Sequence, residues 1–113
     1  MHELSLALNI IDIVGEECRK AGSQRVEEVV ILVGTLSGVD TDALSTSLHV
    51  ASRDTVLQNA RIQLNRQQGK GYCDGCKHEF FMEDILSLCP LCFQPATSLT
   101  EGEDMRIESI VVD

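Results

Sequence analysis

The sequence predicts an α+β fold, in which a small mixed three-stranded sheet with two helices carries a four-cysteine lobe inserted before its last strand. Three observations predict it. Apolar residues recur at helical spacing over residues 4–21, a β-branched apolar run follows at Val26–Val33, and four cysteines are confined to residues 73–92. At 113 residues, the chain is long enough for one small domain and a metal-stapled lobe.

The first helix is predicted by an apolar stripe at spacings of three and four, with Gly22 as its stop. The stripe consists of Leu4, Leu8, Ile11, Val14 and Cys18. We therefore expect Cys18 to be a small buried hydrophobe, the alternative being a fifth metal-binding or redox thiol.

The elements after this helix are predicted by a change in the spacing of apolar residues. Val26–Val33 is typical of a strand buried on both faces. After a glycine-containing break, Asp40 or Thr41 is expected to cap a second helix that runs to about Arg53. Residues 60–67 alternate around Ile62 and Leu64, which predicts a half-exposed strand.

The last strand is predicted at Met105–Val112, with Met105, Ile107 and Ser109 on its inner face. Polar linkers at 67–71 and 97–104 are expected to lead into and out of the cysteine lobe. Because an apolar terminal strand must pair with the sheet, the lobe is an insertion. The predicted domains are therefore residues 1–68 with 104–113, and a lobe with its linkers at 69–103.

The cysteines form two C-x2-C pairs, Cys73 with Cys76 and Cys89 with Cys92, separated by twelve residues. Two tight turns of this kind offer four thiolates to a tetrahedral zinc ion, as in a zinc ribbon. Gly75 is expected to supply a positive φ in the first turn. The alternatives are two disulfides, four free thiols, or iron on the same sulfurs in an electron carrier of rubredoxin type.

Charge excludes one large class of function. The formal net charge is −9, which disfavours nucleic-acid binding because phosphate neutralisation needs lysine and arginine. No apolar run approaches the length of a membrane span. The acidic start lacks a basic leader, so we expect a cytoplasmic protein, in a compartment that keeps thiolates reduced.

The N-terminal triplet is a candidate chelate. The α-amine of Met1, the backbone nitrogen of His2 and its imidazole can close adjacent rings around one metal. The amide or carboxylate of Glu3, or a donor from elsewhere, can complete the plane. Nitrogen donors in a plane suit Ni²⁺ or Cu²⁺ better than zinc. We expect His49 to be solvated or a helix cap, the alternative being a metal ligand. We expect His78 to lie beside the zinc sulfurs or in solvent, the alternative being a part in nickel or sulfur chemistry.

These residues together resemble one family. The start Met1-His2-Glu3-Leu4-Ser5-Leu6, the segment Gly34-Thr35-Leu36-Ser37-Gly38-Val39, the paired knuckles and the closing residues 107–113 are similar to the HypA/HybF family of hydrogenase maturation proteins. The resemblance implies a nickel metallochaperone that delivers Ni²⁺ to the large subunit of [NiFe]-hydrogenase with the GTPase HypB. Some members also serve urease maturation proteins.

The resemblance also implies which residues bind each metal. It assigns nickel to Met1, His2 and Glu3, and structural zinc to the four cysteines. The chain departs from the pattern at Phe93, where a glycine commonly follows the second knuckle, and in the second helix, where aromatic residues are common.

Catalysis is not expected, because the sequence shows no activated nucleophile and no acid–base pair. The phosphate-loop pattern G-x4-G-K-[ST] is missing, so GTP hydrolysis must come from another protein. A third possibility is a zinc-stapled interaction module without nickel. We expect a monomer, or a dimer that exchanges its last strand between copies.

Overall fold

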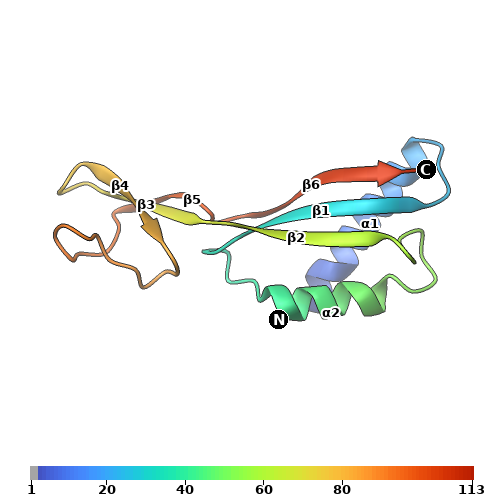
Figure 1. The fold of residues 1–113 in the computed structure, drawn as a ribbon, viewed down its shortest axis with the longest axis horizontal. Coiled ribbons are helices and arrows are strands. Elements are labelled where there is room, and N and C mark those ends of the chain that lie inside the picture. Colours follow the sequence, from blue (N-terminus) through green and yellow to red (C-terminus); the bar gives the residue numbers. More distant parts are fainter. Residues whose placement is uncertain (1–2) are drawn as a thin grey trace. The chain divides into compact units, whose positions relative to one another are not determined.

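The chain forms two helices and six strands over residues 3–113, the part that a computed structural model describes (Figure 1). In chain order these are α1 (Glu3–Lys20), β1 (Val26–Gly34), α2 (Thr41–Ala51), β2 (Arg61–Gln67), β3 (Gly69–Cys73), β4 (His78–Met82), β5 (Ser98–Glu101) and β6 (Met105–Val112). The strands make two three-stranded sheets, ordered β2-β1-β6 and β4-β3-β5. The predicted α+β class, with a cysteine lobe before the last strand, is confirmed.

Helix α1 matches its prediction within one residue at each end. Gly22 ends it in the left-handed region, with φ of 72°, and the Ser23 N–H then donates to the Cys18 carbonyl at 3.1 Å. Cys18 is fully buried, as predicted. The predicted stripe is wrong at its start: Leu4 and Leu8 are 56% and 50% exposed, and Ala7 and Ile10 are buried in their place.

Strand β6 runs antiparallel to β1. The Asp113 N–H donates to the Arg25 carbonyl at one end, and the Gly34 N–H donates to the Asp104 carbonyl at the other. The Ser23 hydroxyl and the Arg25 guanidinium both donate to the Asp113 carboxylate. The hydrogen bond from Ser23, with a further contribution from Arg25, lowers the pKa of that carboxyl.

Strand β2 runs parallel to β1. An ion pair of 3.6 Å joins Arg61 at the start of β2 to Glu28 near the start of β1. Past the end of β1, the Thr35 N–H donates to the carbonyl of Gln67, the last residue of β2. The sheet is therefore mixed, as predicted, and Ile62 in β2 is half-buried as expected.

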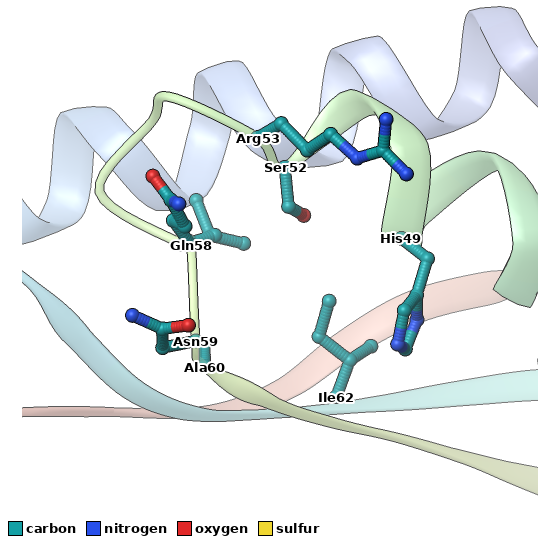
Figure 2. A pocket seen from close by; sticks show the side chains of 8 residues that line it. His49, Ser52, Arg53, Gln58, Asn59, Ala60 and Ile62 are labelled. Carbon is teal, nitrogen blue, oxygen red and sulfur yellow. The ribbon is translucent and has the colours of Figure 1, made fainter.

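Two burial predictions for this sheet are wrong. In β1, Val29 and Ile31 are buried but Val30 is only half-buried, so the strand has one inner face and not two. The helices explain this, because both lie on the same side of the strands in Figure 2. In β6, Ser109 is exposed and Ile110 is half-buried. From this point on, the inward-pointing positions are therefore shifted by one residue relative to the prediction.

Helix α2 begins at the first of its two predicted caps. The Asp40 carboxylate accepts the backbone N–H groups of Asp42 and Ala43 at 3.0 and 3.1 Å. The helix ends at Ala51, before the predicted Arg53, and an irregular loop connects it to β2.

The predicted linkers at 67–71 and 97–104 are wrong, because each contains a strand. Strand β3 pairs antiparallel with both β4 and β5 in the second sheet. Sequence patterns miss these strands because they are short and β3 holds Gly69 and Gly71, which normally weaken a strand. Both glycines are needed: a Cβ would lie 2.5 Å from Leu36 Cγ at Gly69, and 2.5 Å from Met82 Sδ at Gly71.

Three glycines meet at a point that we call the glycine junction: Gly34 at the end of β1, Gly69 at the start of β3, and Gly102 after β5. A Cβ on Gly34 would collide with the Gly102 carbonyl. A Cβ on Gly102 would lie 2.5 Å from the Gly69 Cα, and Gly102 also has a φ of 83°. The backbones therefore approach too closely for any side chain here.

Replacing Gly102 with alanine should destabilise the protein more than replacing Gly38. Gly38 also has a left-handed φ, of 78°, but a Cβ there would meet no atom within 4 Å. Gly38→Ala should therefore cost only the left-handed conformation, about 1–2 kcal/mol. Gly102→Ala should cost about 1–3 kcal/mol more, from overpacking. Urea unfolding followed by circular dichroism checks this, and equal costs would contradict the close approach.

The chain divides into two compact units. The first comprises Met1–Ile31, Val39–Asn65 and Ile107–Asp113, and the second comprises Leu32–Gly38 and Arg66–Arg106. Thr35 shows why residues 32–38 group with the cysteines. Its hydroxyl accepts the Gly69 N–H at 2.8 Å and donates to the Met82 carbonyl at 3.3 Å. Within residues 3–113, no helix is long and apolar enough to cross a membrane.

Candidate metal centre

The four cysteines of the two knuckles converge in the second unit. Their Sγ atoms all lie within 4.8 Å of one another, and the Cys73 and Cys92 sulfurs are 3.6 Å apart. Tetrahedral zinc with bonds of about 2.3 Å would place its sulfurs about 3.8 Å apart. All four are free thiols, so they are not arranged as two disulfides. Four soft donors at this spacing fit a zinc ion.

Each knuckle is closed by the residue that follows its second cysteine. The Lys77 N–H donates to the Cys73 carbonyl at 2.7 Å, and the Phe93 N–H donates to the Cys89 carbonyl at 2.8 Å. Lys77 and Phe93 have left-handed φ values of 57° and 61°. The prediction of a positive φ at Gly75 is wrong. The left-handed position lies two residues later, which explains why a glycine would suit the place of Phe93.

A small apolar cluster supports the cysteines from one side. Phe80 and Met82 of β4 are buried together with Cys73 and Cys89. Phe81, the next residue of the strand, is 64% exposed because alternate side chains of a strand point to opposite faces. The cluster thus fixes the two more deeply buried sulfurs, one from each knuckle.

The thiols resist joint ionisation. A hydrogen bond with Cys92, followed by burial, raises the pKa of Cys76 to about 12. The backbone N–H of Gln94 lowers the pKa of Cys92, but burial and the neighbouring thiols outweigh it, and the net direction is upward. These two groups therefore keep their protons until a cation takes the protons' place.

Cys89 behaves in the opposite way. Burial raises the pKa of its thiol, but hydrogen bonds from the Cys92 N–H, the His78 side chain and the Leu91 N–H together lower it to about 6. The His78 Nε2 lies 3.3 Å from the Cys89 Sγ. His78 is therefore a neighbour that donates to one ligand, as one of its two predicted placements states. Of Cys76, Cys89 and Cys92, Cys89 is therefore the thiol that ionises most readily to bind a cation.

Replacing His78 with alanine should weaken zinc binding about 10–100-fold, the usual cost of losing a group that supports a ligand. Without that hydrogen bond, the pKa of Cys89 should rise from about 6. Protons compete with the metal below the thiol pKa, so the fall in zinc affinity on acidification should begin at a higher pH in the variant. Competition with a chromophoric chelator between pH 5 and 8 measures this, with His49→Ala as control. Coincident pH profiles would contradict the role of His78.

Of the three predicted nickel residues, Glu3 lies within the part of the chain that the structure describes. Met1 and His2 lie outside the described residues 3–113. Glu3 is the first residue of α1, and its Oε2 accepts the backbone N–H of Asp40 at 3.2 Å. The carboxylate thereby ties the start of α1 to the cap of α2. Sequence patterns gave no sign of this contact, because its partners are 37 positions apart.

The remaining candidates, Cys18 and His49, belong to the first unit and are not members of the cysteine cluster. Cys18 is buried in α1, where its thiol faces the Ser23 carbonyl at 3.4 Å. His49 is exposed in the last turn of α2. Within residues 3–113, the cysteine cluster is the group of histidine, cysteine and acidic side chains with the spacing of a metal site.

Comparisons with known proteins agree over nearly the whole chain. A family model described as "Hydrogenase/urease nickel incorporation, metallochaperone, hypA" matches residues 1–112. A hydrogenase maturation factor HypA from Parabacteroides distasonis is 36% identical over 112 residues, which cover 99% of this chain and 97% of the relative. Another, from Geobacter metallireducens, is 34% identical over 114 residues and covers both chains fully.

Solved structures share the fold. The solution structure of the Ni metallochaperone HypA from Helicobacter pylori aligns with a TM-score of 0.70, over 99% of this chain and 97% of that chain, at 23% identity.

Proposed function

We propose that this chain, which belongs to the HypA family of hydrogenase and urease nickel-incorporation metallochaperones, carries Ni²⁺ at its N-terminus and delivers it to the large subunit of [NiFe]-hydrogenase. The family consists of metallochaperones and not of enzymes, as the sequence predicts. The observation that carries the proposal is the match over residues 1–112, since that range contains both the N-terminal triplet and the four cysteines.

Zinc is the resident ion in this proposal, held by Cys73, Cys76, Cys89 and Cys92. When bound, it supplies no chemistry beyond fixing four thiolates, because a site with four protein ligands has no open position. The chain's own contribution is the folded second sheet that presents the sulfurs. Iron would suit the same four sulfurs, and visible absorbance distinguishes it, since a ferric site is red and zinc is colourless.

Nickel is the cargo, and we assign its donors to Met1, His2 and Glu3. The amine, the backbone nitrogens and the imidazole are nitrogen donors that suit planar Ni²⁺. Glu3 is the first residue of α1, so its N–H is one of the four at a helix start that lack a helical acceptor. Its carboxylate is engaged by Asp40. We therefore propose that Glu3 gives its backbone nitrogen, and not its carboxylate, as the remaining donor.

Two substitutions of Glu3 separate these roles. Glu3→Ala removes the carboxylate and keeps the N–H, whereas Glu3→Pro removes both and is compatible with the first position of a helix. We expect Glu3→Pro to bind nickel at least about tenfold more weakly than Glu3→Ala, as expected for a lost ligand. Calorimetric nickel titration of zinc-loaded protein measures the difference. Equal affinities would exclude the backbone nitrogen as a donor.

Delivery completes the proposed function. An open N-terminal chelate lets a second protein take the ion by ligand exchange, one donor at a time. We place this step in the cytoplasm, with HypB as the GTPase partner, because this chain has no phosphate loop of its own. Maturation of urease is the related role that the family description names. We propose residues 1–68 and 104–113 as the nickel domain, and 69–103 as the zinc lobe.

A transfer assay tests delivery. Nickel-loaded protein is mixed with nickel-free large-subunit precursor, and the nickel content of the separated precursor is followed over time. We expect the precursor to take up nickel faster from this protein than from a small chelator that buffers Ni²⁺ at an equal concentration. Precursor that loads equally fast from the protein and from the chelator would contradict delivery while leaving nickel binding intact.

A further inference from the structure

A pocket of about 310 Å³ lies in the first unit, where the end of α2, the loop after it and the start of β2 meet (Figure 2). The proposed metal functions leave it unused. Its lining residues are His49, Ser52, Arg53, Leu57, Gln58, Asn59, Ala60 and Ile62.

The pocket has an apolar floor and a polar rim. Ile62 is half-buried and offers hydrocarbon surface, whereas Leu57 lines the pocket but is 1% exposed and belongs to the core behind it. The Ser52 hydroxyl is already engaged, since it donates to the Leu48 carbonyl at 2.6 Å. Figure 2 shows His49 and Arg53 on one side of the hollow, and Gln58 and Asn59 on the other. The side chains of His49 and Arg53 thus lie opposite the amides of Gln58 and Asn59 across an apolar floor.

The charge of the rim is opposite to that of the protein. The chain has 18 acidic residues against 9 lysines and arginines. Five of those nine cations pair with carboxylates, but Arg53 has no ion pair within residues 3–113, and neither has His49. Within the same described range, no residue lining the pocket is acidic. The pocket therefore presents unneutralised positive charge on a strongly acidic molecule.

The helix end alone does not account for the position of Arg53. Basic residues favour the last turn of a helix because the carbonyls there are unpaired. At this end the Leu48 carbonyl accepts the Ser52 N–H at 2.9 Å, and the Val50 carbonyl accepts the Arg53 N–H at 3.4 Å. Backbone donors therefore satisfy both carbonyls, and within residues 3–113 the Arg53 guanidinium has no ion pair, so its donors are available to a ligand.

Hydrogen bonds within the loop that carries Gln58 and Asn59 hold it in one conformation without a ligand. The Asp54 N–H donates to the Gln58 Oε1 at 3.1 Å, and the Leu57 N–H donates to the Thr55 Oγ1 at 3.1 Å. Asp54 and Asn59 hold left-handed φ values of 62° and 75°, which cost energy in residues other than glycine. A loop fixed in this way loses little conformational entropy when a ligand binds.

We propose that this pocket binds a carboxylate carried on a short apolar stem. The Arg53 guanidinium matches the two oxygens of a carboxylate, and the His49 imidazole and the Asn59 amide add N–H donors from the sides. Ile62 covers the stem. Two sources have this chemistry: the C-terminal residue of a protein, and a free small carboxylic acid. The inference is independent of both metals.

Four probes test it on the full zinc-loaded chain, with amide proton–nitrogen spectra as the readout. They are N-acetyl-leucine, a pentapeptide ending in leucine, and the C-terminal amide of each. We expect the two acids to cause saturable shifts in residues 49–62, and the two amides to cause none. Tighter binding of the peptide than of N-acetyl-leucine identifies a protein terminus as the source, and equal binding identifies a small acid.

Matched variants locate the interaction. Arg53→Gln should weaken binding about tenfold or more, and Asn59→Asp should weaken it similarly by placing a negative charge in the rim while tolerating the left-handed backbone. Arg66→Gln, which changes an exposed arginine outside the pocket, should bind like the parent. Spectra of the free variants show whether each is folded. Shifts from the amides equal to those from the acids, parent-like binding in folded Arg53→Gln, or no saturable shift would each overturn the proposal.

Discussion

Replacing His2 with alanine should abolish tight nickel binding and leave zinc in place. The imidazole is the one side-chain nitrogen in the proposed nickel chelate, so its loss removes a donor and opens a ring. We expect at least about a hundredfold loss of nickel affinity, since losing even a group that supports a ligand costs 10–100-fold. Because the zinc sulfurs are at residues 73–92, zinc content should stay at one ion per chain.

Calorimetric titration of zinc-loaded, tag-free protein at neutral pH measures both affinities. His49→Ala is the matched control, because it removes an exposed histidine from α2. Adding one residue before Met1 is a second perturbation, since it displaces the α-amine while keeping every side chain. Nickel titrations of His2→Ala and of the extended chain that match the parent would exclude the N-terminus as the nickel site. Loss of zinc from His2→Ala would mean that the two sites are not separate.

Removing zinc should unfold the second sheet and leave the first unit folded. The apolar cluster beside the cysteines has only two large buried side chains, Phe80 and Met82, which is little for a sheet of three short strands. Structural zinc contributes about 10–16 kcal/mol at neutral pH in small peptides, enough to order such a sheet. The first unit has its own core, which includes Ile10, Ile31 and Leu44.

Hydrogen exchange followed residue by residue distinguishes the units. After chelation, or in Cys89→Ser, amides of β3 and β4 should lose protection, while amides of α1 should keep it. Cys18→Ser is the control, because Cys18 is buried in α1 of the first unit and is not a member of the cluster, so its replacement should leave zinc affinity unchanged. Uniform loss of protection in both units on chelation would show that zinc holds the whole chain together. Unchanged protection in β3 would show that the second sheet folds without it.

Sequence reasoning succeeded where one residue type has one dominant use. The spacing of four cysteines predicted a cluster of four sulfurs, and Asp40 predicted a helix start. The apolar period predicted α1 within one residue at each end. These signals are local, so a single chain contains all the information that they need.

Sequence reasoning failed where tertiary contacts determine the local structure or the burial of a residue. Gly69 and Gly71 looked like a linker, yet close packing against Leu36 and Met82 makes glycine necessary within a strand. The apolar run of β1 suggested two buried faces, but it cannot reveal that both helices pack on one side. The burial of Val30 therefore depends on partners that the run does not contain.

The metal centre shows the same division. Ligand identity came from spacing, whereas the role of His78 depends on which sulfur its ring meets, eleven positions along the chain. The left-handed residues of the knuckles also followed from geometry: Lys77 and Phe93 close turns whose direction the sulfurs impose. The pocket beside Arg53 gave no sequence signal, because its lining combines a helix end, a loop and a strand.

Metal content measured on intact, tag-free protein by native mass spectrometry tests the central claim most directly. The sample is supplied with both zinc and nickel at neutral pH and then freed of loosely held ions. The account predicts a monomer that retains one zinc and one nickel, with nickel released by acid before zinc. A folded monomer that retains one zinc and no nickel would contradict it.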